Sequence, residues 1–426
     1  MDGCDPVRYV PPMPPMPPMP PMPPIPPIPP ESPIPRLRPR TALAVAAAVA
    51  VLATTAPAHA ETEPPGPARD LPSAVDSGPA LGLPSAVDSG AAAGVDDLAR
   101  RLTWRLTPTG STARLRGLSP VSGRVAWASG SLGTVLRTGD GGAHWTASGP
   151  PGASGLEFRD IEAFDARTAV VLSIGEGEAS RVYRTEDGGR TWAETFRNDE
   201  PRAFYDCMAF FDRRHGLAMS DPVDGRFRVL STDDGGRSWR VLPSAGMPEA
   251  LPGEAGFAAS GQCLATAGDR DVWLASGGGA RSRVFHSRDR GRTWKVSDTP
   301  IPAGDPARGV FALAFRDPRH GIAVGGDYRA GQASPDAAAV TEDGGATWRP
   351  AAEPPAAYRS GVTWLPWAPF AAVAVGPSGS DVTLSAGARW RAFDGGSFDT
   401  VACAPDLSCW ASGEQGRVAR LRFGGR

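Results

Sequence analysis

The sequence has little excess of either charge. Its 426 residues include 44 Lys and Arg against 46 Asp and Glu, which gives a formal net charge of -2. Proteins that bind nucleic acid through its phosphates need a basic surface, so this balance argues against a general nucleic-acid-binding protein. Tyrosine is also scarce, with 5 residues beside 15 Phe and 12 Trp. Tryptophan therefore carries an unusually large share of the aromatic burial.

The sequence also lacks a dinucleotide-binding fingerprint and a cluster of metal-ligand residues, so we expect neither a cofactor nor a metal. It has only one long apolar run, Thr41 to Ala56, which is short for a membrane span. Three arginines precede this run, and Ala58-His59-Ala60 follows it. This order is typical of a signal peptide. We expect export after cleavage near Ala60, and an uncleaved N-terminal membrane anchor is the alternative.

Composition divides the chain into four parts. Residues 1–35 are a Pro-rich extension, unless the true start site lies further along, and residues 36–60 form the signal peptide. Residues 61–100 repeat Leu-Pro-Ser-Ala-Val-Asp-Ser-Gly and are rich in Pro, Ala, Gly and Ser, which predicts a disordered linker. Residues 101–426 are expected to fold, and 41% hydrophobic residues in the whole chain are enough to bury a full core.

One phrase, [Ser/Thr]-x-Asp-x-Gly-x-x-Trp, occurs five times in this last part. A sixth copy has Ser385 in place of the Asp and ends at Trp390. Successive tryptophans are 47, 47, 55, 54 and 42 residues apart, a period that indicates stacked or radially arranged units. The Asp and Trp residues of the five intact copies are Asp140 and Trp145, Asp187 and Trp192, Asp234 and Trp239, Asp289 and Trp294, and Asp343 and Trp348.

The residue types of the phrase indicate a structural role. An Asp side chain can accept hydrogen bonds from backbone N–H groups two or three residues further on, and the hydroxyl two positions before it can hold the same loop. Glycine supplies the positive φ of a tight turn. The Trp then begins the next strand and buries its ring between sheets. We therefore interpret the aspartates as turn residues, and we expect the sixth copy to be the loosest.

Each repeat contains four short candidate strands. In the second they cover residues 159–164, 168–172, 181–185 and 192–196. Four antiparallel strands per repeat are typical of a β-propeller blade. The C-terminal unit has only three, and residues 103–107 resemble the missing outer strand. We predict an all-β, seven-bladed propeller of four-stranded antiparallel blades, closed by this N-terminal strand, with six or eight blades as the counting alternatives.

Four of the five cysteines follow the cleavage site, namely Cys207, Cys263, Cys403 and Cys409. Cys207 and Cys263 occupy equivalent positions in consecutive repeats, and Cys403 and Cys409 flank a short turn. In an oxidising compartment we expect disulfides 207–263 and 403–409. Free buried thiols are the alternative.

The stretch 127–142, Trp-Ala-Ser-Gly-Ser-Leu-Gly-Thr-Val-Leu-Arg-Thr-Gly-Asp-Gly-Gly, resembles the Asp-box (BNR, sialidase-type) propellers. Within these, residues 103–423 are most similar to the exported bacterial proteins grouped with the photosystem II stability/assembly factor family. The resemblance implies the fold. It does not choose among the hydrolases, binding modules and assembly factors that share this fold.

Propeller geometry places the loops that enter the inner strands on one face and the Asp boxes on the other. Charged residues of both signs meet at the channel mouth on the first face, either as rim charges that pair with each other or as a binding funnel for a peptide or an acidic ligand. The ligand-binding candidates at this mouth are Arg116, Arg159, Asp160, Tyr205, Asp206, Asp221, Asp224, Asp327, Tyr328, Arg359 and Asp399.

Catalysis by this face is possible in two forms, and we predict no catalytic residue. A sialidase needs an arginine triad and a tyrosine activated by a glutamate, but the motif Phe/Tyr-Arg-Ile-Pro is missing and no tyrosine has an evident glutamate partner. A glycosidase would need two carboxylates from this face. We expect instead an exported, monomeric binding scaffold or assembly factor for an envelope or membrane protein. A hydrolase and a carbohydrate-binding propeller are the alternatives.

Overall fold

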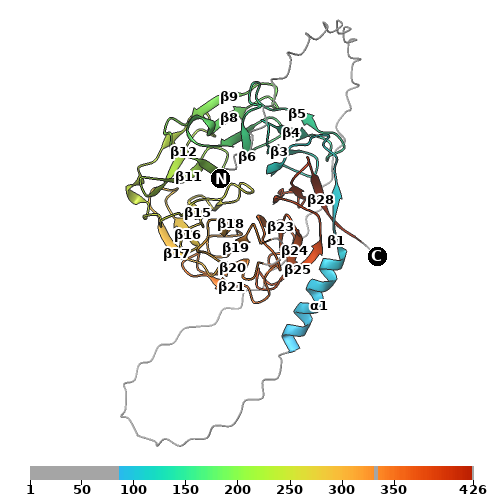
Figure 1. The fold of residues 1–426 in the computed structure, drawn as a ribbon. Coiled ribbons are helices and arrows are strands. Elements are labelled where there is room, and N and C mark those ends of the chain that lie inside the picture. The colour runs from blue at the N-terminus through green and yellow to red at the C-terminus, as the bar shows by residue number, and fades with distance from the viewer. Residues whose placement is uncertain (1–85, 331–333, 425–426) are drawn as a thin grey trace, which may run out of the picture. The chain divides into compact units, whose positions relative to one another are not determined.

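The structure is a computed structural model that describes residues 86–330 and 334–424 (Figure 1). The Pro-rich extension, the cleavage site and residues 61–85 of the expected linker lie outside these residues. In the part that is described, seven four-stranded antiparallel sheets form the blades of a propeller. The first strand of each blade contacts the first strands of its two neighbours, so these inner strands surround a central channel. The predicted fold class and blade count are confirmed.

We number the blades in chain order and give the strands of each from the innermost outward. Blade 1 contains β2 (Leu115–Pro120), β3 (Ala126–Gly130), β4 (Val135–Thr138) and β5 (Thr146–Ala147); blade 2 contains β6 (Glu157–Ala163), β7 (Ala169–Ile174), β8 (Arg181–Thr185) and β9 (Ala193–Arg197); blade 3 contains β10 (Tyr205–Phe210), β11 (Gly216–Val223), β12 (Arg226–Thr232) and β13 (Arg240–Val241); blade 4 contains β14 (Leu264–Ala267), β15 (Asp271–Ala275), β16 (Arg283–Ser287) and β17 (Lys295–Asp298). Blade 5 contains β18 (Arg308–Phe315), β19 (Gly321–Asp327), β20 (Ala338–Thr341) and β21 (Arg349–Pro350); blade 6 contains β22 (Gly361–Trp364), β23 (Ala372–Gly376), β24 (Gly379–Thr383) and β25 (Arg391–Asp394); blade 7 contains β26 (Thr400–Cys403), β27 (Cys409–Ser412), β28 (Val418–Phe423) and β1. Two short 3-10 helices, η1 (Gly177–Ala179) and η2 (Ser244–Gly246), lie between strands.

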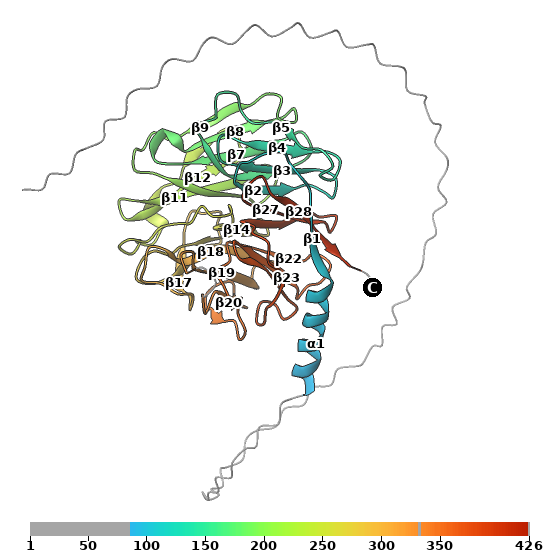
Figure 2. The same ribbon diagram turned by 45° about the vertical axis from the view of Figure 1, so that its right-hand side comes forward.

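The ring is closed by the N-terminal strand, as predicted. Strand β1 (Leu102–Leu106) pairs antiparallel with β28, with Leu102 opposite Phe423 and Leu106 opposite Ala419. The two strands lie side by side in Figures 1 and 2. Blade 7 therefore contains both ends of the domain, and β1 forms its outermost strand.

The end of the expected linker is helical rather than disordered. Helix α1 (Ala86–Arg101) contains no proline, and Asp97 forms ion pairs with Arg100 and Arg101 one turn on. Its Val95 and Ala99 are buried in a cluster with residues of blades 6 and 7, and Asp96 accepts a hydrogen bond from Arg391 at 3.0 Å. Burial of this apolar stripe against the propeller stabilises a helix that the Ala- and Gly-rich sequence alone does not predict.

The Asp boxes form the turns that join the third and fourth strands of their blades. In the second, the Asp187 carboxylate accepts backbone N–H groups three and four residues on, from Arg190 and Thr191, at 3.0 and 2.9 Å. These donors, above all Thr191, lower the pKa of Asp187 to about 2. The Thr185 hydroxyl accepts the Gly189 N–H at 3.0 Å. The carboxylate is thus occupied in closing its own turn.

The sixth box is the loosest, as predicted. Ser385 accepts one backbone N–H, from Arg389 at 2.9 Å. The hydrogen bond from Gly387 N–H to the Thr383 hydroxyl is 3.3 Å long, whereas the corresponding distances in the five intact boxes are 2.8 to 3.0 Å.

Both predicted disulfides are present, Cys207–Cys263 and Cys403–Cys409. The first joins the inner strand β10 of blade 3 to the residue just before the inner strand β14 of blade 4. The second closes the turn between β26 and β27. Among the described residues, no helix is both long and apolar enough to cross a membrane.

Candidate functional site

A cavity of about 700 Å³ lies where the chain enters the inner strands. All seven blades contribute to its wall, blade 4 through the segment 256–259 that precedes its inner strand. The cavity is therefore at the mouth of the central channel, on the face opposite the Asp boxes. We call it the upper cavity.

Three arginines line one side of the upper cavity. Arg114 donates to both oxygens of Asp399, at 2.8 Å from Nε and 2.6 Å from Nη2. Arg116 lies beside the same carboxylate, with its Nε 3.9 Å from Oδ2. Arg159 donates from Nη1 to the Ala258 carbonyl at 2.9 Å. Arg159 also pairs with Glu157, with Nη2 3.6 Å from Oε2, and Glu414 lines the same cavity. The carboxylate of Asp399 thus serves two guanidinium groups, of which Arg116 is the less completely paired.

Arg116 has the clearest unused donor. Its Nε is buried and has no hydrogen-bond partner within the described residues. Burial lowers the pKa of Arg116, and the nearby Asp399 only partly opposes this. An arginine nevertheless stays charged at neutral pH. A buried cation with an unpaired donor is costly. Because the Arg116 side chain as a whole keeps 19% of its surface exposed, a carboxylate that entered the cavity could pair with its guanidinium group.

Aromatic rings form another part of the same wall. Phe257 and Phe311 are stacked with ring centroids 3.9 Å apart, and Tyr358 meets Phe311 edge to face at 4.7 Å. Tyr328 contacts the same ring at 6.1 Å and is exposed. Rings of this kind present apolar area to a ligand at little cost in conformational entropy. The cavity can therefore bind a molecule that has both an anionic and an apolar part.

A pair of aspartates faces the upper cavity from blade 3. Asp206 (β10) and Asp221 (β11) are close enough for each carboxyl group to shift the pKa of the other. Asp221 accepts the Gly256 N–H at 2.7 Å, whereas Asp206 Oδ2 is buried and has no hydrogen-bond partner among the described residues. Burial raises the pKa of Asp221 to about 6. Burial and the neighbouring charge together raise the pKa of Asp206 well above its ordinary range. The pair therefore holds a proton at slightly acidic pH and carries less negative charge than two free carboxylates.

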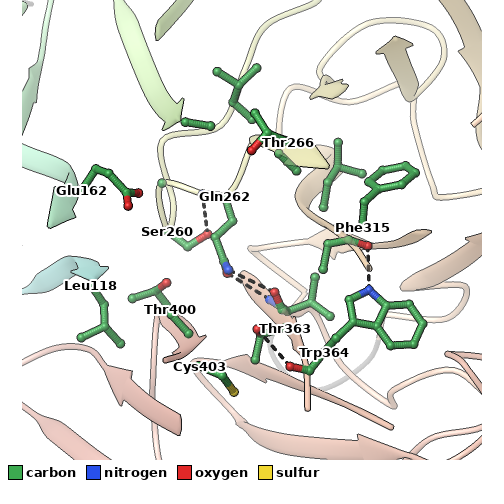
Figure 3. A pocket seen from close by; sticks show the side chains of 18 of the residues that line it. Leu118, Glu162, Ser260, Gln262, Thr266, Phe315, Thr363, Trp364, Thr400 and Cys403 are labelled. Atoms are coloured by element: carbon green, nitrogen blue, oxygen red, sulfur yellow. Dashed lines mark hydrogen bonds between the residues drawn. The ribbon is translucent and has the colours of Figure 1, made fainter. Parts of the chain in front are cut away.

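A second cavity of about 580 Å³ lies further along the channel and is shown in Figure 3. We call it the lower cavity. It is lined by the inner strands and reaches Arg316, Pro366 and Pro405, which follow the inner strands of blades 5, 6 and 7. It therefore opens toward the Asp-box face.

Gln262 separates the two cavities. Its side-chain amide donates to the carbonyls of Val362 and Val401, at 3.0 and 3.1 Å, and its oxygen accepts the Val362 N–H at 3.0 Å. This side chain of blade 4 thus reaches blades 6 and 7 across the channel (Figure 3). Residues 256–259 line the upper cavity and residues 260–262 the lower one, so the segment 256–262 lies between them.

The structure separates the predicted mouth residues into three groups. Asp160 lines the lower cavity, where its carboxylate accepts the N–H groups of Ile161 and Met208 at 2.8 and 2.6 Å. Burial raises its pKa well above the ordinary range. The upper cavity is lined by six of the predicted residues: Arg116, Arg159, Asp206, Asp221, Tyr328 and Asp399.

The other four line neither cavity. Arg359 points into blade 6, where it is buried against Asp381 with Nε 2.6 Å from Oδ2. Tyr205 is fully buried and packs edge to face on Phe196 at 5.6 Å. The two remaining residues, Asp224 and Asp327, form ion pairs on the rim with Arg202 and Arg308, at 2.9 and 3.0 Å.

Arg114 and the stacked rings of Phe257 and Phe311 also line the upper cavity, although they were not among the residues predicted at the mouth. A signal for the latter was present, because Trp239 and Trp294 are 55 residues apart where the preceding spacings are 47. The extra residues belong to the segment that precedes β14 and crosses the channel. Among the described residues, no group of three or more His, Cys, Asp or Glu could hold a metal ion.

No protein-family model matches the chain, and no curated protein matches it. Solved structures do. YCF48 bound to D1 peptide matches with a TM-score of 0.53 and 13% identity over 76% of this chain and 95% of that one. The Pan2 WD40 domain of Neurospora crassa matches with a TM-score of 0.54 and 13% identity over 77% and 97%.

A GH74 enzyme of Niastella koreensis matches with a TM-score of 0.50 and 11% identity. The match covers 74% of this chain and 53% of that enzyme. At these identities the likeness establishes the propeller fold alone. At that level it agrees with the Asp-box resemblance read from the sequence.

Proposed function

We propose that this protein is an exported, non-catalytic propeller that holds an acidic peptide segment of an envelope or membrane protein in its upper cavity. The observation that carries the proposal is the buried, unpaired Nε of Arg116 beside two further arginines and a set of aromatic rings. A peptide can supply a carboxylate for the first feature and apolar side chains for the second. The protein would act as a monomeric binding scaffold or assembly factor.

The comparison with YCF48 supports a peptide as the ligand, because that protein has this fold and its structure is of a complex with D1 peptide. From this comparison we infer only the class of ligand for this chain, a peptide. The two disulfides fit an oxidising compartment, in agreement with export through residues 36–60 and cleavage near Ala60. Sequencing the N-terminus of the mature protein distinguishes this from an uncleaved membrane anchor.

The hydrolase alternatives find weak support at this site. Burial raises the pKa of Tyr358, so its phenol is poorly suited to be a sialidase nucleophile. The carboxyl groups of Asp206 and Asp221 are direct neighbours that shift each other's pKa, whereas the two carboxyl groups of a retaining glycosidase lie about 5 Å apart and those of an inverting one further. We expect no turnover of methylumbelliferyl glycosides. Turnover that is lost in Asp206→Ala or Asp221→Ala would overturn the non-catalytic proposal.

Photo-crosslinking tests the peptide ligand directly. A photoreactive amino acid at Tyr328, which is exposed at the cavity wall, should capture acidic segments from detergent extracts of the source membranes. Arg116→Glu should abolish the capture, and Arg105→Glu, on the exposed outer strand of blade 7, should leave it unchanged. Equal capture by both variants would refute an arginine-dependent site. Glycan-array binding that needs the same residues would favour the carbohydrate-binding alternative.

A further inference from the structure

Glu162 is an unpaired carboxylate in the wall of the lower cavity. Figure 3 shows its side chain directed toward the cavity, from the left of the view. Within the described part of the chain, no hydrogen bond or ion pair reaches this carboxylate, and burial raises its pKa to about 7. Its neighbour on β6, Asp160, differs because two backbone N–H groups satisfy its oxygens. Glu162 is therefore a partly buried carboxyl group with no partner of its own, and a cation in the cavity could pair with it.

The cavity offers no cation of its own to Glu162. Arg316 is the one arginine in the described wall, and it is held elsewhere. Its guanidinium lies over the rings of Trp364 and Phe370, 5.1 Å from each centroid, donates to the Pro369 carbonyl, and pairs with Asp317 at 3.4 Å. The other charged residues of the described wall are thus Asp160, whose oxygens accept backbone N–H groups, and Arg316, whose guanidinium is paired elsewhere.

The rest of the wall is mainly apolar, with Leu118, Ile161, Leu264 and Leu313 among its residues. Thr363 and Thr400 add hydroxyl groups. The Gln262 amide closes the cavity on the side of the upper cavity. At about 580 Å³ the cavity has the size of a small-molecule site. It is open at one end, lined by apolar groups, and carries one free carboxylate.

We propose that the lower cavity binds a small organic cation, an ammonium group on an apolar stem, with Glu162 as the counter-ion. The stem would occupy the apolar wall, and the hydroxyl oxygens would accept the remaining ammonium N–H groups. This site is separate from the peptide site of the upper cavity and does not depend on it. Because the ammonium favours the ionised carboxylate, affinity should rise as the pH increases from 5.5 to 8.

Three probes with one stem test the proposal: hexylammonium, hexanol and hexanoate, each titrated calorimetrically into the full-length protein. We expect hexylammonium to bind at least about tenfold more tightly than hexanol, and hexanoate not to bind. In Glu162→Gln the preference for hexylammonium over hexanol should disappear, whereas Glu157→Gln, on the same strand but outside the lower cavity, should retain it. Circular dichroism and thermal unfolding confirm that each variant is folded.

Two outcomes would overturn the proposal. One is equal affinity of the wild type for hexylammonium and hexanol, and the other is an ammonium preference that survives Glu162→Gln. Thr363→Trp, which fills the cavity, should abolish binding of every probe, and retained binding would place the site elsewhere. Nα-acetyl-lysine methylamide, which keeps its side-chain ammonium group, distinguishes a lysine of a peptide from a free amine as the natural source of the ammonium.

Discussion

The Asp206–Asp221 pair makes stability depend on pH in a direction opposite to that of an ordinary surface carboxylate. Burial raises the pKa of Asp221 from 3.8 to about 6, so the folded state binds more protons than the unfolded state between these pH values. The resulting stability is fully present below pH 3.8 and is lost as the pH rises through 6. A shift of this size corresponds to a loss of about 3 kcal/mol in the free energy of unfolding above pH 6, which is an upper value for one group.

Asp221→Asn removes this cost. The amide oxygen can still accept the Gly256 N–H, and the amide nitrogen can donate to Asp206, so the contacts of the protonated carboxyl are kept. We expect the variant to match the wild type at pH 4 and to be more stable at pH 8 by up to about 3 kcal/mol. Denaturant unfolding followed by tryptophan fluorescence, with the disulfides intact, measures both values.

Asp224→Asn is the matched control, three residues away on the rim. Arg202 lowers the pKa of Asp224, so its contribution is present above the unfolded pKa and is lost as the pH falls. The control variant should therefore lose stability at pH 8 and not at pH 4. If Asp221→Asn changes the free energy of unfolding equally at pH 4 and pH 8, the pair does not hold its proton in the folded state, and our description of the cavity charge is wrong.

Three further substitutions test the framework around the cavities. Ser385→Asp should place a carboxylate in the sixth box that can accept a second backbone N–H group, as Asp187 does, and raise stability by about 1 kcal/mol. An unchanged or lower unfolding midpoint would contradict the turn geometry. Loss of the disulfide in Cys207→Ser with Cys263→Ser opens a bridge with a sequence separation of 56 and should cost about 4 kcal/mol, measured by denaturant unfolding. Arg359→Ala should lower the free energy of unfolding by about 3 to 5 kcal/mol because it leaves Asp381 buried without its partner. Peptide capture by the folded variant should be retained. A specific loss of capture would mean that Arg359 belongs to the binding site.

The fold could be predicted because the Asp box marks one fixed turn in every blade. That turn depends on contacts within eight residues, so local sequence determines it. The same holds for ring closure, since Thr103-Trp104-Arg105 has the pattern of the strand that follows each box. Helix α1 was missed for the opposite reason: burial of Val95 and Ala99 against blades 6 and 7 stabilises it, and a propensity argument does not include that contact.

Within the site, the sequence predicted which residues reach the mouth but not the direction of their side chains. Arg359 lies just before the inner strand β22, as predicted, but its side chain points into the blade, where it donates a hydrogen bond to Asp381 on β24. Tyr205 likewise turns into the core beside Phe196. Side-chain direction depends on the partner that tertiary structure supplies, and no repeat pattern encodes that partner.

The segment 256–262 gives the two cavities their separate chemistry. It lies between an arginine-lined cavity and one with a free carboxylate, and three hydrogen bonds of Gln262 together with the adjacent disulfide at Cys263 hold it across the channel. With this partition in place, neither ligand contacts a residue of the other cavity. Arg116→Glu should therefore weaken binding of the acidic peptide alone, Glu162→Gln should weaken binding of hexylammonium alone, and the double variant should show each loss unchanged. Binding of hexylammonium and of an acidic peptide, measured by calorimetry in all four proteins, tests this. A coupling energy of 1 kcal/mol or more would mean that the Gln262 bridge transmits strain between the sites instead of separating them.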